Sequence, residues 1–277
     1  MTSFYHGFDT LHLNWFTGCE RGLPCWDRCW ARALANRLKG RYGYPAAEPF
    51  RPTFHEEAFN RPLPKQPSVI ALNFMGDWAL ASQRDEFWPM LDKIRCAPQH
   101  TFLTLTKRPV MLGSNVDGGD LPDNLWLGMS TFGKVDRAAW DALNSIPAAH
   151  YWLSYEPLLE APELPLPLPH WVVAGCESGR GARWGKWLCG RNGLCTPLRE
   201  RCAGSGCANY PAEQIDERTN EPHLEVLDWL RSLRDQCAAA GTPFMCKQVP
   251  VFKGGKWLVS NYIEDFPPDL QCQERPR

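Results

Sequence analysis

The fold is decided by three consecutive segments: Ser68-Val-Ile-Ala-Leu-Asn-Phe-Met75, residues 84–97, and His100-Thr-Phe-Leu-Thr-Leu-Thr106. The first and third are short apolar runs of the kind that form buried strands. The middle segment has the apolar spacing of an amphipathic helix. Its apolar face consists of Phe87, Met90, Leu91 and Ile94. The order strand, helix, strand is typical of a βαβ unit with two parallel strands.

This alternation continues along the chain. Further strands are predicted at Asn124–Ser130, His150–Glu156, His170–Gly175 and Pro243–Gln248. Further helices are predicted at residues 28–38, 135–146 and 223–240. About six such units favour an α/β protein with a full or partial (β/α) barrel over a sandwich.

Polar residues lie at or just after the ends of most of the predicted strands. They are Asn73, Asp77, Lys107, Arg108, Ser130, Glu156, Glu177, Lys247 and Gln248. The carboxyl ends of barrel strands are where such proteins carry their chemistry, so we expect these residues to line a shared pocket. Strand ends are also polar merely because loops face water, and that alternative stays open for each residue. For Asn73 and Asp77 the alternative is turn formation and helix capping.

Composition narrows the class of protein. Of the 277 residues, 44% are hydrophobic and 22% are charged, which excludes wholesale disorder. The formal net charge of −1 does not indicate a nucleic-acid binder. No apolar run has the length of a membrane span, and the start does not resemble a secretory signal. With twelve cysteines and no export signal, we expect a cytoplasmic protein, in the host cytoplasm if a phage encodes it, whose clustered thiols bind metal.

The first cysteine cluster is Thr17-Gly-Cys-Glu-Arg-Gly-Leu-Pro-Cys-Trp-Asp-Arg-Cys-Trp-Ala31. Its thiols, Cys19, Cys25 and Cys29, have the spacing C-x5-C-x3-C. Three thiolates suit a four-iron cluster with one iron left open, and soft ligands favour iron–sulfur sites. Zinc with a distant fourth ligand, such as His6 or His12, is equally compatible with this spacing.

A second cluster lies in a Gly-rich stretch without apolar periodicity. Its cysteines are Cys189, Cys195, Cys202 and Cys207. Four thiolates complete either a zinc site or a second iron–sulfur cluster, here with a slight preference for iron–sulfur. The predicted organisation is therefore a barrel portion at residues 1–179, a metal-binding insertion at 180–221, and barrel completion with a C-terminal tail at 222–277.

The insertion is also basic. We consider four of its residues as contacts to a nucleic-acid backbone: Arg180, Arg183, Lys186 and Arg191. Trp184 and Trp187 are suited to stacking on bases. A basic surface loop with tryptophans in the core explains the same pattern.

Seven motifs, in an unbroken order from Asn14 to Phe244, carry a family resemblance. They are Asn14–Cys19, Asn73–Asp77, Gln99–Pro109, Asn124–Ser130, Ser154–Leu159, Gly175–Arg183 and Arg234–Phe244. With these motifs taken together, the chain resembles a phage- and prophage-associated family of radical-SAM-like proteins with an N-terminal three-cysteine motif. It departs from the family pattern in placing three residues between Cys25 and Cys29 instead of two, and in carrying Trp30 in place of tyrosine.

The resemblance implies a partial barrel holding a [4Fe-4S] cluster on Cys19, Cys25 and Cys29. S-adenosylmethionine (SAM) would bind the open iron, and an electron from an external donor would cleave it to a 5′-deoxyadenosyl radical. By the same analogy, the cofactor-binding residues are Trp30, Asn73, Asp77, Ser130, Glu156 and Glu177. The catalytic residue is unknown, and the candidates are Glu156, Glu177, Lys107 and Cys176.

The leading functional hypothesis is a radical SAM enzyme that modifies or isomerises a hypermodified nucleobase in phage DNA. The radical chemistry rests on the cysteine triad and the resemblance, whereas DNA as a partner rests on the basic insertion and the phage association. One alternative is a non-enzymatic nucleic-acid-binding module stapled by metal. Another is a radical SAM enzyme that modifies a peptide or protein.

Overall fold

A computed structural model describes residues 10–23, 25–116, 119–178, 225–253 and 256–275, together with four short strands between residues 187 and 222. The chain divides into two compact units. The first comprises Met1–Ser130 and Asp136–Trp152, and the second comprises Thr131–Val135 and Leu153–Arg277.

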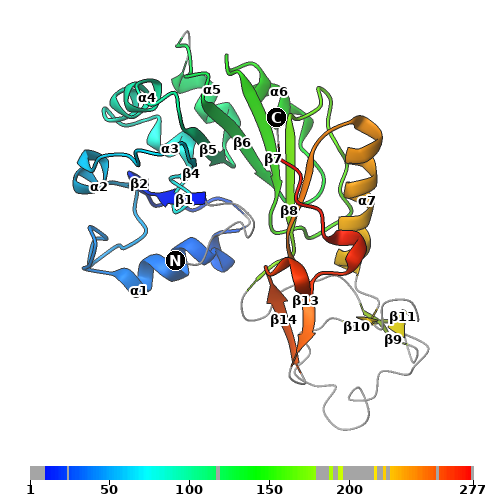
Figure 1. Ribbon diagram of the computed structural model, residues 1–277. Coiled ribbons are helices and arrows are strands. Elements are labelled where there is room, and N and C mark those ends of the chain that lie inside the picture. Colours follow the sequence, from blue (N-terminus) through cyan, green and yellow to red (C-terminus); the bar gives the residue numbers. More distant parts are fainter. Residues whose placement is uncertain are drawn as a thin grey trace. The chain divides into compact units, whose positions relative to one another are not determined.

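The first unit alternates strands with helices (Figure 1). Its strands are β1 (Thr10–Leu13), β2 (Phe16–Thr17), β3 (Thr53–Phe54), β4 (Val69–Leu72), β5 (Thr101–Thr106), β6 (Leu125–Thr131) and the first half of β7 (His150–Tyr155). Its helices are the short 3-10 helix η1 (Trp26–Arg28), α1 (Trp30–Leu38), α2 (Glu56–Asn60), α3 (Trp78–Ala81), α4 (Phe87–Arg95), α5 (Pro109–Asn115) and α6 (Arg137–Asn144).

The second unit contains the remaining elements. Its strands are the end of β7, β8 (Trp171–Gly175), β9 (Trp187–Cys189), β10 (Gly193–Cys195), β11 (Ile215–Asp216), β12 (Glu221–Pro222), β13 (Phe244–Lys253) and β14 (Lys256–Ser260). Its helices are α7 (Glu225–Ala240) and the 3-10 helices η3 (Ile263–Asp265) and η4 (Pro268–Leu270). Helix α7 contacts both β8 and β13.

The main sheet has eight strands in the order β1-β4-β5-β6-β7-β8-β13-β14. Pairing is parallel from β1 through β4 and β5 to β6, and again between β8 and β13, whereas β14 adds to β13 in the antiparallel direction. The strands therefore follow one another in chain order, which is the order of a β/α barrel. The protein is a mixed α/β protein compatible with a partial barrel, as the sequence predicts.

Local signals explain why several elements begin where they do. Asp136 precedes α6 and its carboxylate accepts hydrogen bonds from the backbone N–H groups of Ala138 and Ala139. Helix α5 begins with Pro109, whose fixed φ suits the first helical position. In β6 the lack of a side chain at Gly128 admits the indole of Trp152, since a Cβ there would lie 2.4 Å from Nε1.

Every strand predicted above is present, and the boundary that differs most is the end of the last one. Lys247 and Gln248 were expected to end a strand, but β13 continues to Lys253 because its second half pairs with β14. The parallel register with β8 shifts between Cys246 and Gln248, so Lys247 is the extra residue of a β-bulge. The predicted insertion at 180–221 falls almost entirely outside the described residues.

No helix in the described part of the chain combines the length and the hydropathy that crossing a membrane requires.

The packing at Gly128 gives the first prediction. Gly128→Ala should lower the free energy of unfolding by about 2–3 kcal/mol, because the added methyl group overlaps the buried Trp152 ring. Gly113→Ala is the matched control, since the nearest atom lies 3.7 Å from its Cβ position within α5. It should stabilise the protein by about 0.5–1 kcal/mol, as Ala replaces Gly in a helix. Urea denaturation measures both, and equal stability of the two variants would contradict the packing described.

Candidate functional site

The first cysteine of the triad is held in place by backbone contacts on both sides. Gly18 donates its N–H to the carbonyl of Met75, and Cys19 donates its N–H to the carbonyl of Phe50, both at 3.0 Å. Gly18 has φ +99°, and a Cβ there would lie 2.2 Å from the carbonyl oxygen of Arg51. Only glycine fits this position. The Thr-Gly-Cys sequence therefore fixes the backbone position from which the Cys19 side chain extends.

Two asparagines tie the segment before Cys19 to the end of β4. The Asn73 side-chain oxygen accepts hydrogen bonds from the N–H groups of Trp15 (2.8 Å) and Phe16 (2.9 Å). The Asn14 side-chain oxygen accepts in return from the N–H of Met75 (3.1 Å). Asn73 has φ +61°, a left-handed conformation that asparagine tolerates better than most residues. It is thus a positioning residue for the cysteine segment, and its amide oxygen already has two donors.

The other two cysteines lie around η1 and the start of α1. Cys19, Cys29 and Trp26 all pack against one hydrophobic cluster. The buried members of this cluster are Ala31, Ala35, Tyr44, Phe50 and Met75. The indole N–H of Trp26 is buried and has no hydrogen-bond partner among the described residues. A buried donor without a partner calls for an explanation, and an acceptor bound at this site is one.

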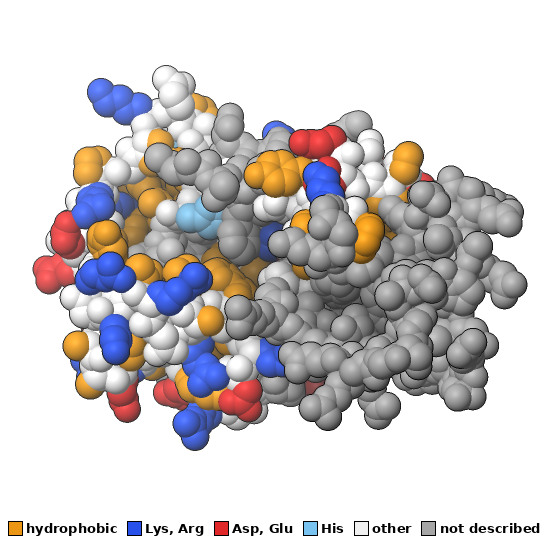
Figure 2. All heavy atoms as spheres, turned by 90° about the horizontal axis from the view of Figure 1, so that it is seen from below, with side chains coloured by type: hydrophobic (Ala, Val, Ile, Leu, Met, Phe, Trp, Pro, Cys, Tyr) orange, Lys and Arg blue, Asp and Glu red, His pale blue; other side chains and the backbone are white. Residues whose placement is uncertain are grey.

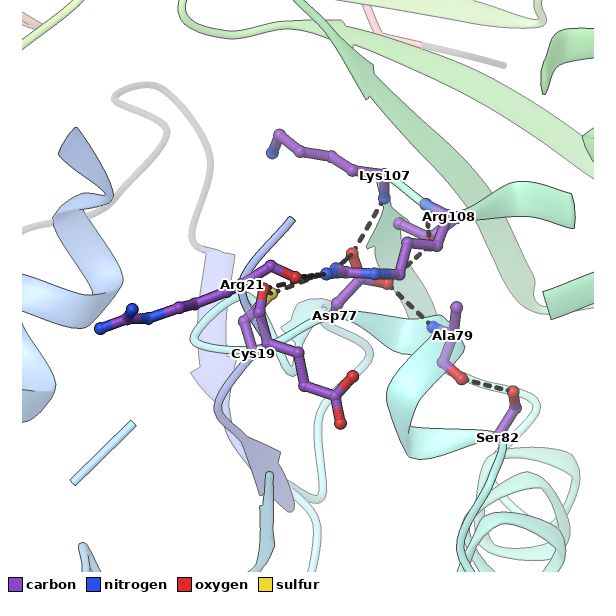
Figure 3. Close-up of polar contacts among 9 residues, drawn as sticks. Cys19, Arg21, Asp77, Ala79, Ser82, Lys107 and Arg108 are labelled. Atoms are coloured by element: carbon purple, nitrogen blue, oxygen red, sulfur yellow. Dashed lines mark hydrogen bonds and ion pairs between the residues drawn. The ribbon is translucent and has the colours of Figure 1, made fainter. Parts of the chain in front are cut away.

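A buried carboxylate joins this segment to the end of β5 (Figure 3). Asp77 caps α3 by accepting the N–H of Ala79, and it also accepts the Thr106 hydroxyl (2.6 Å) and the Lys107 N–H (3.1 Å). The Arg108 guanidinium lies 3.4 Å from the second carboxylate oxygen. The Asp77 and Arg108 side chains are only 6% and 12% exposed. The alternative that Asp77 caps a helix is thus correct, and the carboxylate has a partner at each oxygen.

Arg108 continues from Asp77 to the cysteine loop. Its Nη1 donates to the Cys19 sulfur at 3.2 Å, and its Nη2 donates to the carbonyl oxygens of Glu20 (2.9 Å) and Arg21 (3.5 Å). Sequence reasoning placed Arg108 at a strand end but did not predict its contact with Cys19. In Figure 3 the neighbouring Lys107 side chain extends away from Asp77, so only its backbone takes part in this network.

The thiols are compatible with metal binding in their chemistry. All three are free and of intermediate exposure. Burial raises the pKa of the Cys19 thiol, and the hydrogen bond from Arg108 opposes that rise. Burial likewise raises the pKa of the Cys25 thiol, against the nearby charge of Lys107. In the described residues no group of three or more His, Cys, Asp or Glu side chains is already arranged around a metal position. The donor set and the orphan Trp26 N–H fit an iron–sulfur cluster, whereas the thiols are not preassembled around one.

A second buried ion pair lies in the second unit, at Glu156 after the end of β7. The Lys247 ammonium lies 2.7 Å from Oε1 of Glu156, and the Ser154 hydroxyl donates to Oε2 at 3.0 Å. The Glu156 and Lys247 side chains are 14% and 8% exposed. The contact with Lys247 lacks hydrogen-bond geometry, so Oε1 is buried without a hydrogen-bond partner among the described residues. The ion pair with Lys247 is therefore the interaction that compensates the negative charge at Oε1.

The bulge in β13 and the glycine at the end of β8 make this pair possible. A Cβ on Gly175 would lie 3.2 Å from Oε1 of Glu156 and 2.7 Å from a side-chain carbon of Gln248. Gln248 is held by donating its amide to the Cys176 carbonyl oxygen. Cys176 is completely buried, and burial raises the pKa of its thiol well above the ordinary value. A thiol that stays protonated is a poor nucleophile, so the packing argues against nucleophilic chemistry at Cys176, and a catalytic role for this thiol stays a prediction.

The remaining predicted residues divide into three groups. Ser130 is half-buried on β6, Glu177 is buried directly after Cys176, and Trp30 begins α1 with 43% of its surface exposed. Six predicted residues lie outside the described residues: Arg180, Arg183, Lys186, Arg191, Cys202 and Cys207. Cys189 and Cys195 are on the hairpin of β9 and β10, where the side chains are not described.

Comparison with known proteins assigns a family. Residues 8–210 match the family model described as a protein of unknown function (DUF5131). The chain belongs to the DUF5131 family. No curated protein and no solved structure matches it. The DUF5131 match contains the cysteine loop, the Asp77–Arg108 pair and Glu156, whereas α7 and β13, with Lys247, follow it in the chain.

The Asp77 network gives a stability prediction. Asp77→Ala should lower the free energy of unfolding of this DUF5131 protein by about 3–5 kcal/mol, because it leaves Arg108 buried without its carboxylate and three further donors without an acceptor. Asp92→Ala removes an acidic residue that is 72% exposed and paired with Arg95. That control should cost less than about 1 kcal/mol. Urea denaturation measures the free energy of unfolding of both variants. Similar losses would show that the Asp77 network contributes no more to stability than an exposed ion pair.

The Glu156–Lys247 pair gives a second prediction. Lys247→Met should destabilise the protein by about 3 kcal/mol, because a buried carboxylate loses its counter-charge. Combining it with Glu156→Gln should cost less than the sum of the two single changes by about 1–3 kcal/mol. The exposed pair Arg137–Asp141 on α6, whose side chains are 67% and 51% exposed, should show a coupling below about 0.5 kcal/mol. Additive losses at Glu156 and Lys247 would exclude a coupled ion pair.

Proposed function

We propose that this DUF5131 protein is a radical SAM enzyme whose [4Fe-4S] cluster is held by Cys19, Cys25 and Cys29. The observation that carries the proposal is the anchored cysteine loop, in which three free thiols follow a glycine-fixed turn and the Arg108 guanidinium donates to the Cys19 sulfur. A cluster with three thiolate ligands carries negative charge. Arg108 and Lys107 supply the opposite charge on this side of the loop.

When bound, such a cluster supplies one-electron reduction of SAM to a 5′-deoxyadenosyl radical. The protein's own residues hold and orient the loop that contains the cysteines. Asn73 fixes the segment that leads into Cys19, and Asp77 with Arg108 joins the loop to the end of β5. Trp30, Ser130, Glu156 and Glu177 stay predictions as cofactor contacts.

We further propose that the substrate is a nucleobase in phage DNA. This rests on the resemblance and on the basic residues of the insertion, which lie outside the described part of the chain. Figure 2 shows that, on the face it presents, Lys and Arg side chains are interspersed with Asp and Glu over the described residues. We expect the phosphate-binding surface on the insertion, where a second [4Fe-4S] cluster or zinc would bind Cys189, Cys195, Cys202 and Cys207. A reducing compartment, the cytoplasm, suits all these thiols.

Anaerobic reconstitution tests the proposal. The wild-type protein should bind four iron and four sulfide ions at the first site and convert SAM to 5′-deoxyadenosine when a reductant is present. Cys25→Ala should lower that conversion at least about a hundredfold, because the cluster loses one of three ligands. Cys96→Ala, an exposed thiol at the end of α4, is the matched control and should retain full conversion.

The same experiment separates the alternatives. A colourless protein that binds zinc and DNA and never cleaves SAM would identify a metal-stapled nucleic-acid-binding module. Full SAM cleavage by Cys25→Ala would show that the ligand assignment is wrong. If SAM is cleaved but a peptide and not DNA becomes labelled, the protein is a peptide modifier.

A further inference from the structure

The position of Arg108 has a consequence for electron transfer. Four groups of the protein accept hydrogen bonds from this one guanidinium: the Cys19 sulfur, the carbonyl oxygens of Glu20 and Arg21, and the Asp77 carboxylate. It is 12% exposed, and its backbone N–H is held by the Thr106 hydroxyl at 2.9 Å. The guanidinium is therefore a fixed donor aimed at a ligand sulfur (Figure 3).

We propose that Arg108 is a positioning residue that sets the reduction potential of the cluster through its hydrogen bond to Cys19. The inference rests on the proposed function, since it requires a cluster on this loop. One electron from an external low-potential donor makes the cluster and its ligand sulfurs more negative. A donor to a ligand sulfur stabilises that reduced state more than the oxidised state, so it raises the reduction potential.

The fork geometry of arginine is essential to this role. One guanidinium reaches the sulfur, the carboxylate and two carbonyl oxygens at the same time, because its N–H groups point in fixed, different directions. A lysine ammonium keeps the charge but is a compact point donor on a flexible stem. Replacing Arg108 with lysine therefore separates the effect of the positive charge from the effect of the hydrogen-bond geometry.

Potentiometric titration of the reconstituted cluster, followed by electron paramagnetic resonance, tests the proposal on three variants of the full chain. Arg108→Met should lower the midpoint potential so that the ratio of reduced to oxidised cluster at a fixed solution potential falls about tenfold, or 59 mV for a one-electron couple. Arg108→Lys should retain at least half of that shift. Arg137→Met, at a residue whose side chain is 67% exposed on α6, should leave the potential unchanged.

Each outcome decides the matter. An unchanged potential in Arg108→Met with full iron content overturns the inference and leaves the proposed function intact. A wild-type potential in Arg108→Lys shows that charge alone acts, which also overturns it, and this variant decides if Arg108→Met does not fold or bind iron. An equal shift in Arg137→Met would identify a non-specific effect of charge. Wild-type protein that binds no iron–sulfur cluster would refute the proposed function and, with it, this inference.

Discussion

The first unit depends on the burial of one charged side chain, the Asp77 carboxylate, which is 6% exposed. Removing an ionised carboxylate from water is costly unless hydrogen bonds and an opposite charge replace the lost solvation. For Asp77 these are the hydrogen bonds from the first turn of α3 and from Thr106 at the end of β5, and the ion pair with Arg108. Arg108 also donates a hydrogen bond to Cys19. The ion pair that stabilises the buried Asp77 carboxylate therefore also helps to fix the position of a predicted metal ligand.

Much of this fold can be predicted because its strands are local apolar runs. The segments around β4, β5 and β8 are recognisable without knowing their neighbours. β1 is not predicted, since Thr10–Leu13 is short and includes His12 on a strand whose stability comes from pairing with β4. The extension of β13 beyond Gln248 also depends on a partner, β14, rather than on its own composition.

The candidate site is predictable in its residue types but not in its contacts. Cysteine spacing identifies the three thiols, and the Asn73–Asp77 motif identifies the turn after β4. The partners of Asn73 are nearly sixty positions away in sequence, and Cys19 is 89 residues from Arg108, so neither contact has a local signal. Lys107 and Arg108 look equivalent in sequence. They differ in the structure because adjacent side chains at the end of a strand point in different directions.

The two buried acidic residues differ in a way that bears on function. Both oxygens of Asp77 have hydrogen-bond donors from the protein, so this carboxylate is used in holding the chain together. The charge of Glu156 is instead compensated by the Lys247 ammonium, 2.7 Å from Oε1, and by the Ser154 hydroxyl, 3.0 Å from Oε2. Asp77 acts through Arg108 on the loop that contains Cys19, whereas Glu156 joins the end of β7 to β13 within the second unit.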